Sequence, residues 1–229
     1  MKSKEELLLL SKTRALMYRF LSGIYLREVD EEQLSALKKL SFPVIEGDTD
    51  ADMDLREGYT LLKQAVEKLQ PEDLDDLAAD YSKVFLAAGE ATGRAAFPYE
   101  SVYVDKKRQV GGSTAMQMKA LYLARGFTPD PEFYRTMDDN IGLILEYMSI
   151  LCDEITQNLE AGNAEQADLV TTEQKKFLKK HVTNWVYSFT SDVIKLSGTS
   201  FYKAIAMITS GFIKKEAALL KGGKVWDIA

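Results

Sequence analysis

The residues best suited to recognising a charged ligand lie near the middle of the chain, in the stretch Phe97 to Val104. This stretch has the sequence Phe-Pro-Tyr-Glu-Ser-Val-Tyr-Val. Glu100 is flanked by Tyr99 and Tyr103, and a carboxylate between aromatic rings suits a guanidinium, which accepts both bidentate hydrogen bonding and ring stacking. Alternatively, both tyrosines are core residues and Glu100 is solvated. The residues alone leave both interpretations open.

A second polar group begins 38 positions further on, where Asp138, Asp139 and Asn140 precede an apolar segment that predicts a helix. Acidic residues at the start of a helix are ordinary caps. They contribute to binding only where they converge with Glu100 in one groove. A single predicted helix over about 113–125 separates the two segments, and this short connection permits such a convergence.

Most of the usual catalytic and metal-binding chemistry is missing, because His181 is the only histidine. A carboxylate-bridged di-iron bundle needs two Glu-x-x-His pairs, and zinc sites use several imidazole or thiol ligands. The nucleophile-elbow motif Gly-x-Ser-x-Gly and the glycine-rich nucleotide-binding motifs are absent. We therefore expect no enzyme, no cofactor and no metal site, and we interpret His181 as a helix-packing residue.

Two further features have competing interpretations. Cys152 lies in an apolar helical pattern that predicts a small buried residue, whereas a reactive thiol paired with His181 would need two helices to align them. Gly111-Gly112-Ser113-Thr114 leads into a helix whose free N–H groups could hold an anion. The same stretch also matches a capping box formed by Thr114 and Gln117.

Hydrophobic periodicity predicts helices over most of the 229 residues, including segments at 4–27, 55–69 and 200–220 and one from Asn163 to a break at Ser197-Gly198. Ser3 with Glu6 and Asp30 with Gln33 match capping boxes. We predict an all-α, single-domain bundle of about eight helices over residues 1–229. A composition change suggests a hinge at 88–97. The central segment from Phe97 is predicted to be non-helical at its start, because Pro98 and the following aromatic and β-branched residues are poor helix formers.

The composition of the chain limits the cellular compartment and the partners that we expect. The formal net charge is −6 and 46% of the residues are hydrophobic. A single cysteine excludes an internal disulfide framework, which fits a reducing compartment. No apolar run reaches the ~18 residues of a membrane span, and the N-terminal leucines lack a secretory cleavage site. We expect a cytoplasmic protein without stable membrane insertion, with no affinity for nucleic acid and with a preference for basic partners.

Several motifs, in order, resemble the TorD/DmsD-type redox-enzyme maturation chaperones. They are Phe-Pro-Tyr-Glu-Ser-Val-Tyr from Phe97, Tyr-x-x-x-Gly-Phe from Tyr122, Asp139-Asn140-Ile141, Gln-x-x-Phe-Leu-x-x-His-x-x-x-Trp from Gln174, and Phe201-Tyr202. The resemblance covers about residues 80–220. The family usually has Asp-His where this chain has Asp139-Asn140. Asn140 still forms hydrogen bonds, but it cannot titrate near neutral pH as a histidine does.

The resemblance implies a cytoplasmic chaperone whose partner is the catalytic subunit of a molybdenum-cofactor oxidoreductase. Such chaperones bind the twin-arginine signal peptide of the subunit and help it acquire its cofactor before export. By position, the implied peptide-binding residues are Tyr99, Glu100, Ser101, Tyr103, Asp139 and Asn140. Two other functions stay open, a helical adaptor for a reductase subunit without a twin-arginine signal and an enzyme that uses carboxylates alone. Whether the protein is a monomer or a domain-swapped dimer is also open.

Overall fold

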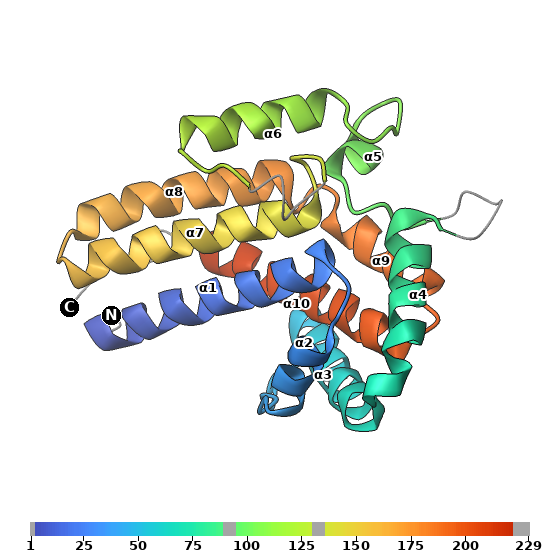
Figure 1. Ribbon diagram of the computed structural model, residues 1–229. Helices are drawn as coiled ribbons and strands as arrows, with labels where there is room; N and C mark the ends of the chain where they lie inside the picture. The colour runs from blue at the N-terminus through green and yellow to red at the C-terminus, as the bar shows by residue number, and fades with distance from the viewer. Residues whose placement is uncertain (1–2, 89–94, 130–135, 222–229) are drawn as a thin grey trace. The chain divides into compact units, whose positions relative to one another are not determined.

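The computed structural model describes residues 3–88, 95–129 and 136–221, and the elements in these ranges are ten α-helices and one short 3₁₀ turn (Figure 1). The only β-type pairing in the same ranges is an isolated antiparallel bridge between Tyr99 and Asn140. The predicted all-α class is therefore confirmed. Within these ranges, no helix combines the length and the hydropathy that a bilayer-spanning segment requires.

The chain groups into two compact units, each built from separated parts of the sequence. The first contains residues 1–26, 99–184 and 216–229, and the second contains residues 27–98 and 185–215. The single-domain organisation over 1–229 stays a prediction. Most of the hinge predicted at 88–97 lies outside the described residues, because residues 89–94 are not described.

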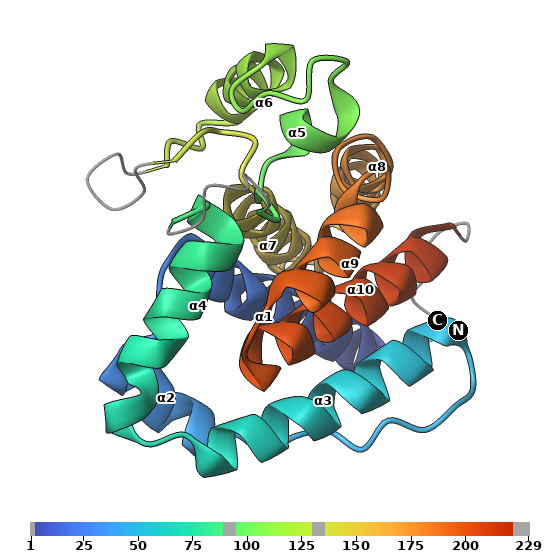
Figure 2. The same cartoon turned by 90° about the vertical axis from the view of Figure 1, so that its right-hand side faces the viewer.

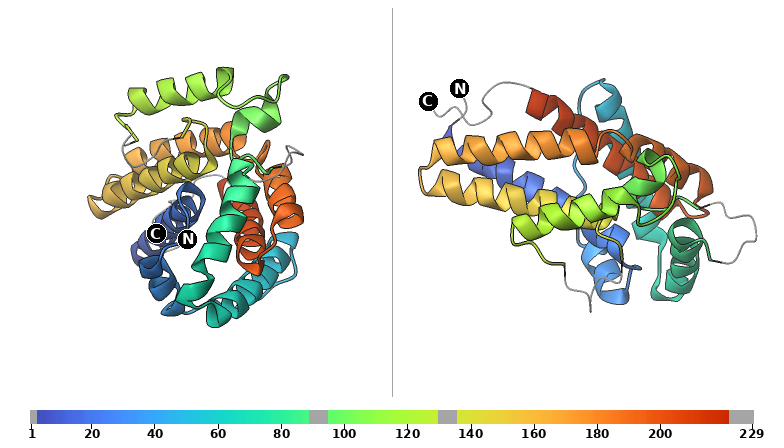
Figure 3. Two further views of the ribbon diagram at one scale, coloured as in Figure 1. Left: turned by 45° about the vertical axis from the view of Figure 1, so that its right-hand side comes forward. Right: turned by 90° about the horizontal axis from the view of Figure 1, so that it is seen from above.

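The first unit has a core of three long helices. α1 (Lys4–Leu26) packs along α7 (Ile141–Glu160), and α7 packs against α8 (Ala164–His181). The buried face of α7 is almost continuous, with apolar residues from Ile141 to Leu159 removed from solvent. The short α5 (Glu100–Val104) and α6 (Ser113–Ala124) lie over α7 and α8 as an outer layer (Figure 3).

The second unit contains α2 (Glu31–Lys38), α3 (Asp50–Lys68), the 3₁₀ turn η1 (Pro71–Asp73), α4 (Leu74–Leu86), α9 (Val186–Leu196) and most of α10 (Ser200–Lys221). α3 and α10 lie side by side in Figure 2. They approach closely at Gly58 and Gly211, where an added Cβ would stand 2.7 Å from a side-chain atom of the facing helix in each case. In the same unit, the buried rings of Tyr81 and Phe85 from α4 contact the ring of Tyr202 from α10.

Two predictions of secondary structure were wrong, one for residues 100–104 and one for the segment from Asn163 to Ser197. Residues 100–104 are helical, because the first N–H groups of this short helix find acceptors on Asp139, so tertiary hydrogen bonds override weak propensity. The predicted helix from Asn163 to Ser197 is divided into α8 and α9. The backbone N–H groups of the β-branched residues Val182 and Thr183 both bond to the Leu178 carbonyl, which closes α8 at His181.

Candidate peptide-binding site

The two predicted binding segments meet in the first unit. The Tyr99–Asn140 bridge joins their backbones. Beside it, the Glu100 N–H donates to the Asp139 carbonyl at 3.0 Å, and the Ser101 N–H donates to Asp139 Oδ2 at 2.9 Å. The start of α5 and the approach to α7 thus form one structural unit, as the sequence analysis required for a joint site.

Tyr99 and Asn140 share a further partner, Thr136. The Tyr99 hydroxyl lies 3.1 Å from Thr136 Oγ1, and Asn140 Nδ2 donates to the same oxygen at 3.0 Å. Asn140 is also the N-cap of α7, because its Oδ1 accepts the Gly142 N–H at 2.8 Å. Asn140 therefore has a structural role at the position where the family usually has histidine.

Glu100 is buried, and its carboxylate is paired with His181. His181 Nδ1 lies 3.0 Å from Oε2 and 3.3 Å from Oε1 of Glu100, and both side chains are at most 4% exposed. Burial raises the pKa of Glu100 above its ordinary value, and the neighbouring His181 and Asn184 counteract part of that rise. The interpretation of His181 as only a packing residue was incomplete. Its position in the motif from Gln174 to Trp185 was the one sequence signal for a shared site.

Asp139 is fully buried, and among the described residues only one of its carboxylate oxygens has a hydrogen-bond partner. Within the described part of the chain, Oδ1 has no hydrogen-bond partner, and the same holds for the buried hydroxyls of Ser101 and Tyr122. Buried polar atoms usually have partners, so three such atoms close to the binding motifs are notable. The carboxylates of Asp138, Glu100 and Asp139 are near enough to add to the effect of burial and raise the pKa of Tyr122.

A row of aromatic rings in tilted contact supports this polar cluster. His181 packs on Phe177 with ring centroids 5.1 Å apart, Phe177 packs on Tyr147 at 4.8 Å, and Tyr147 packs on Tyr122 at 5.3 Å. These rings come from α8, α7 and α6. The orientation of the imidazole toward Glu100 is therefore fixed by packing across three helices.

The six predicted peptide-binding residues differ in how far their side chains are exposed to solvent. Tyr99 and Tyr103 are half-buried, whereas Glu100, Ser101, Asp139 and Asn140 are buried. A partner would touch the tyrosine rings first. The carboxylates of Glu100 and Asp139 are buried and already lie in hydrogen bonds within the protein.

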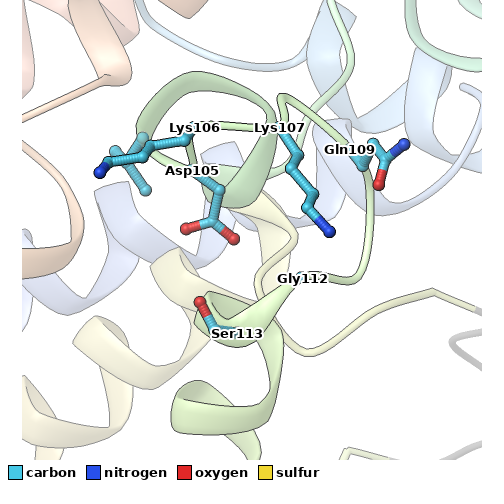
Figure 4. A pocket seen from close by; sticks show the side chains of 7 residues that line it. Asp105, Lys106, Lys107, Gln109, Gly112 and Ser113 are labelled. Atoms are coloured by element: carbon cyan, nitrogen blue, oxygen red, sulfur yellow. The ribbon is translucent and has the colours of Figure 1, made fainter.

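The start of α6 does not offer the open anion site that was considered. Thr114 Oγ1 donates to Asp105 Oδ1 at 2.6 Å, and a Cβ at Gly112 would collide with the Asp105 carboxylate. Figure 4 shows this carboxylate in the pocket between the loop with Lys106 and Lys107 and the first residues of α6. The predicted capping box of Thr114 and Gln117 was wrong, because the N-cap is Gly112 and it has no side-chain hydrogen bond.

Cys152 is a buried free thiol, as expected from its pattern. Gln174 Nε2 donates to Sγ at 3.1 Å, and burial raises the pKa of Cys152 to about 11. Because His181 pairs with Glu100, the considered thiol–imidazole pair does not form. Among the described residues, no three His, Cys, Asp or Glu side chains gather as a metal-ligand set.

Comparison with known proteins decides the family. The sequence model of the family described as "Nitrate reductase delta subunit" matches residues 48–191, which is more than half of the chain. The chain belongs to this family. The matched range includes Tyr99, Glu100, Asp139 and His181, so the whole candidate site lies within it.

Curated relatives extend the similarity to nearly the full length. The proteins named "Chaperone protein TorD" from Shewanella pealeana, Psychrobacter sp. and Vibrio cholerae are 25%, 26% and 24% identical to this chain. The alignments cover 92%, 91% and 93% of this chain and 90%, 91% and 94% of the relatives. They confirm the resemblance to TorD-type maturation chaperones. These relatives are named as chaperones and not as enzymes, in agreement with the expectation of a non-catalytic protein.

Proposed function

We propose that this protein is a cytoplasmic chaperone for the catalytic subunit of a molybdenum-cofactor oxidoreductase. It binds the twin-arginine signal peptide of that subunit and assists cofactor loading before export. The observation that carries the proposal is the match to proteins named TorD chaperones over 90% or more of both chains, together with a family model that covers the candidate site.

The geometry supports this function at the level of chemistry. A twin-arginine signal peptide has a basic start and an apolar stretch. The half-buried rings of Tyr99 and Tyr103 offer stacking surfaces for guanidinium groups. Glu100 and Asp139 add carboxylates next to these tyrosines in the two joined segments, which the Ser101 N–H and the Tyr99–Asn140 bridge hold together. Arginine is favoured over lysine at such a site because its planar group can both stack and bond bidentately.

Calorimetry with a synthetic signal peptide tests the proposal. The peptide with two arginines should bind, and replacing both by lysine should weaken binding about tenfold or more, since charge-assisted hydrogen bonds contribute ~1.5–3 kcal/mol each. Tyr99→Ala and Tyr103→Ala should weaken binding similarly. Tyr187→Ala, which removes a half-buried tyrosine of the second unit, is the matched control and should bind like the unmodified protein. Equal affinity of both peptides would reject this site.

A second candidate is favoured by the family description, which names a subunit of a nitrate reductase. In this case the protein is an adaptor that holds a reductase subunit lacking a twin-arginine signal. Measuring the binding of the partner subunit with and without its leader sequence distinguishes the adaptor from the chaperone. Full affinity for the leaderless subunit, with none for the isolated peptide, would support the adaptor. Binding of the isolated peptide supports the chaperone.

A further inference from the structure

We propose that His181 is a positioning residue of the peptide site, which holds the Glu100 carboxylate in place. This inference rests on the proposed function and adds a residue that the binding motifs did not include. His181 is the last residue of α8, and it lies 81 positions from Glu100 in the sequence. Its contact is therefore a tertiary link between α8 and α5.

The position of α5 depends on tertiary contacts. A helix of five residues cannot be stable by its own hydrogen bonds. Its first residue has no side-chain cap, because Tyr99 at the N-cap makes no such bond. Asp139 accepts the N–H groups of Glu100 and Ser101, and His181 binds the Glu100 side chain. Together with the two bonds to Asp139, the His181 contact therefore helps to hold α5, which follows Tyr99 and contains Tyr103, in place.

His181 also affects the pKa of Glu100, which lies close to a second carboxylate. Glu100 and Asp139 are both buried, and the Asp139 carboxylate raises the pKa of Glu100, as burial does more strongly. His181 and Asn184 act in the opposite direction. An Nδ1–H that donates to Glu100 favours the ionised carboxylate. Without His181, Glu100 would take up a proton at higher pH, and the site would lose negative charge facing a cationic peptide.

The surroundings leave the imidazole one main orientation. Its ring packs on Phe177 and is 3% exposed, so water does not compete strongly for the Glu100 contact. The other groups that act on Glu100 are Asp139 before α7, Asn184 after α8 and Tyr122 on α6. Asp139 and Tyr122 do not carry positive charge, and Asn184 is neutral. Among these neighbours, His181 is the one residue that can offset the Glu100 charge.

The proposal is tested with His181→Gln, which keeps a hydrogen-bond donor, and His181→Ala, which removes it. His181→Ala should weaken peptide binding about tenfold, and His181→Gln should recover most of the loss near pH 8. Affinity should fall as pH drops through the pKa of Glu100. In His181→Ala this fall should begin at higher pH, because the hydrogen bond that favours the ionised Glu100 carboxylate is gone. A purely structural role would not shift the midpoint.

A double-mutant cycle supplies the decisive comparison. If the two residues act as a pair, the affinity lost on combining Glu100→Gln with His181→Ala should be little more than the affinity lost in Glu100→Gln alone. Additive losses would overturn the proposal. Thr171→Val is the control, since it changes another buried residue of α8 whose hydroxyl bonds to the Ala167 carbonyl of the same helix. It should leave both the affinity and its pH dependence unchanged.

Two readouts need no peptide, so they separate this inference from the proposed function. Because the chain has one histidine, ¹⁵N NMR of the imidazole reports directly on His181, and Nδ1 should carry a proton. Amide exchange of Ser101 should be about tenfold faster in His181→Ala, as expected for a loosened short helix. If the peptide fails to bind but both readouts hold, the proposed function is wrong and the pairing stands. Unchanged exchange would reject the positioning role.

Discussion

Arg14 and Glu216 form a bidentate ion pair inside the first unit, although 202 positions separate them in the sequence. Arg14 Nε and Nη2 donate to the Glu216 carboxylate at 2.7–3.0 Å, and both side chains are 3% exposed. The Tyr18 hydroxyl donates to the same carboxylate at 2.7 Å. Burial alone would lower the pKa of Arg14, but the charge of Glu216, its hydrogen bond and further contributions from neighbouring groups together outweigh burial and raise the pKa. The pair ties the end of α10 to α1.

Breaking this pair should be strongly destabilising. Glu216→Gln leaves a buried guanidinium without its counter-charge, and such changes cost about 3–5 kcal/mol. Urea denaturation at pH 7 measures the loss. Lys12→Ala is the matched control, because it removes an α1 cation whose ion pair with Glu160 is about half exposed, and it should change stability by less than ~1 kcal/mol. A similar small effect for both variants would mean that the buried pair contributes no more than a surface pair.

Asp80 is predicted to be a local anchor of the second unit. Its carboxylate accepts hydrogen bonds from the Gly198 N–H, the Thr199 N–H and the Thr199 hydroxyl at 2.6–2.9 Å. Asp80→Asn replaces one acceptor oxygen with a donor that faces other donors, and should cost about 1.5–3 kcal/mol in thermal or urea unfolding. Thr199→Val, which removes only the hydroxyl bond, should cost clearly less. Equal losses would show that the two backbone bonds contribute nothing.

The buried Glu100 should give the protein a distinctive pH dependence. Its pKa in the folded state is raised by burial, so the folded state binds this proton more tightly than the unfolded state does. Stability from Glu100 is therefore present below the unfolded pKa and lost as pH rises through the folded pKa. Relative to Glu100→Gln, the unmodified protein should lose free energy of unfolding as pH rises through that window. Glu57→Gln, at an exposed site, should show no such trend. A flat difference for Glu100→Gln would exclude the raised pKa.

Asn140→His would restore the residue that the family usually has, but here it should destabilise the protein. The change removes the side-chain cap on the Gly142 N–H and the bond to Thr136, and loss of an N-cap costs about 1 kcal/mol. Asn140→Asp keeps the acceptor for Gly142 and should be milder. Thermal unfolding at pH 7 compares the two. A more stable Asn140→His variant would show that the imidazole can replace the cap.

The sequence was sufficient for features set by near neighbours. The capping boxes of Ser3 with Glu6 and of Asp30 with Gln33 form as predicted, because each needs only residues three positions apart. α6 and α10 begin and end within a residue or two of the predicted bounds. Hydrophobic periodicity carries this information because it records which face of each helix is buried.

Features that depend on distant residues could not be predicted. The Glu100–His181 pair and the helical state of residues 100–104 both depend on contacts across the fold, which propensity does not encode. The break between α8 and α9 was missed because apolar periodicity continues across it. For the candidate site, the motifs indicated which residues meet. They did not indicate that Glu100 and Asp139 would be buried.

The buried Cys152 can report on unfolding of the first unit, because its thiol becomes reactive only when it is exposed. With a pKa of about 11, the native thiol is almost entirely protonated at neutral pH and is shielded by α1, α7 and α8, so electrophiles and oxidants find little thiolate. An unfolded chain would expose an ordinary cysteine that reacts readily. The alkylation rate of this one thiol therefore records how often the helices of the first unit separate, and a protein of this kind can act beside redox-active partners without being modified itself.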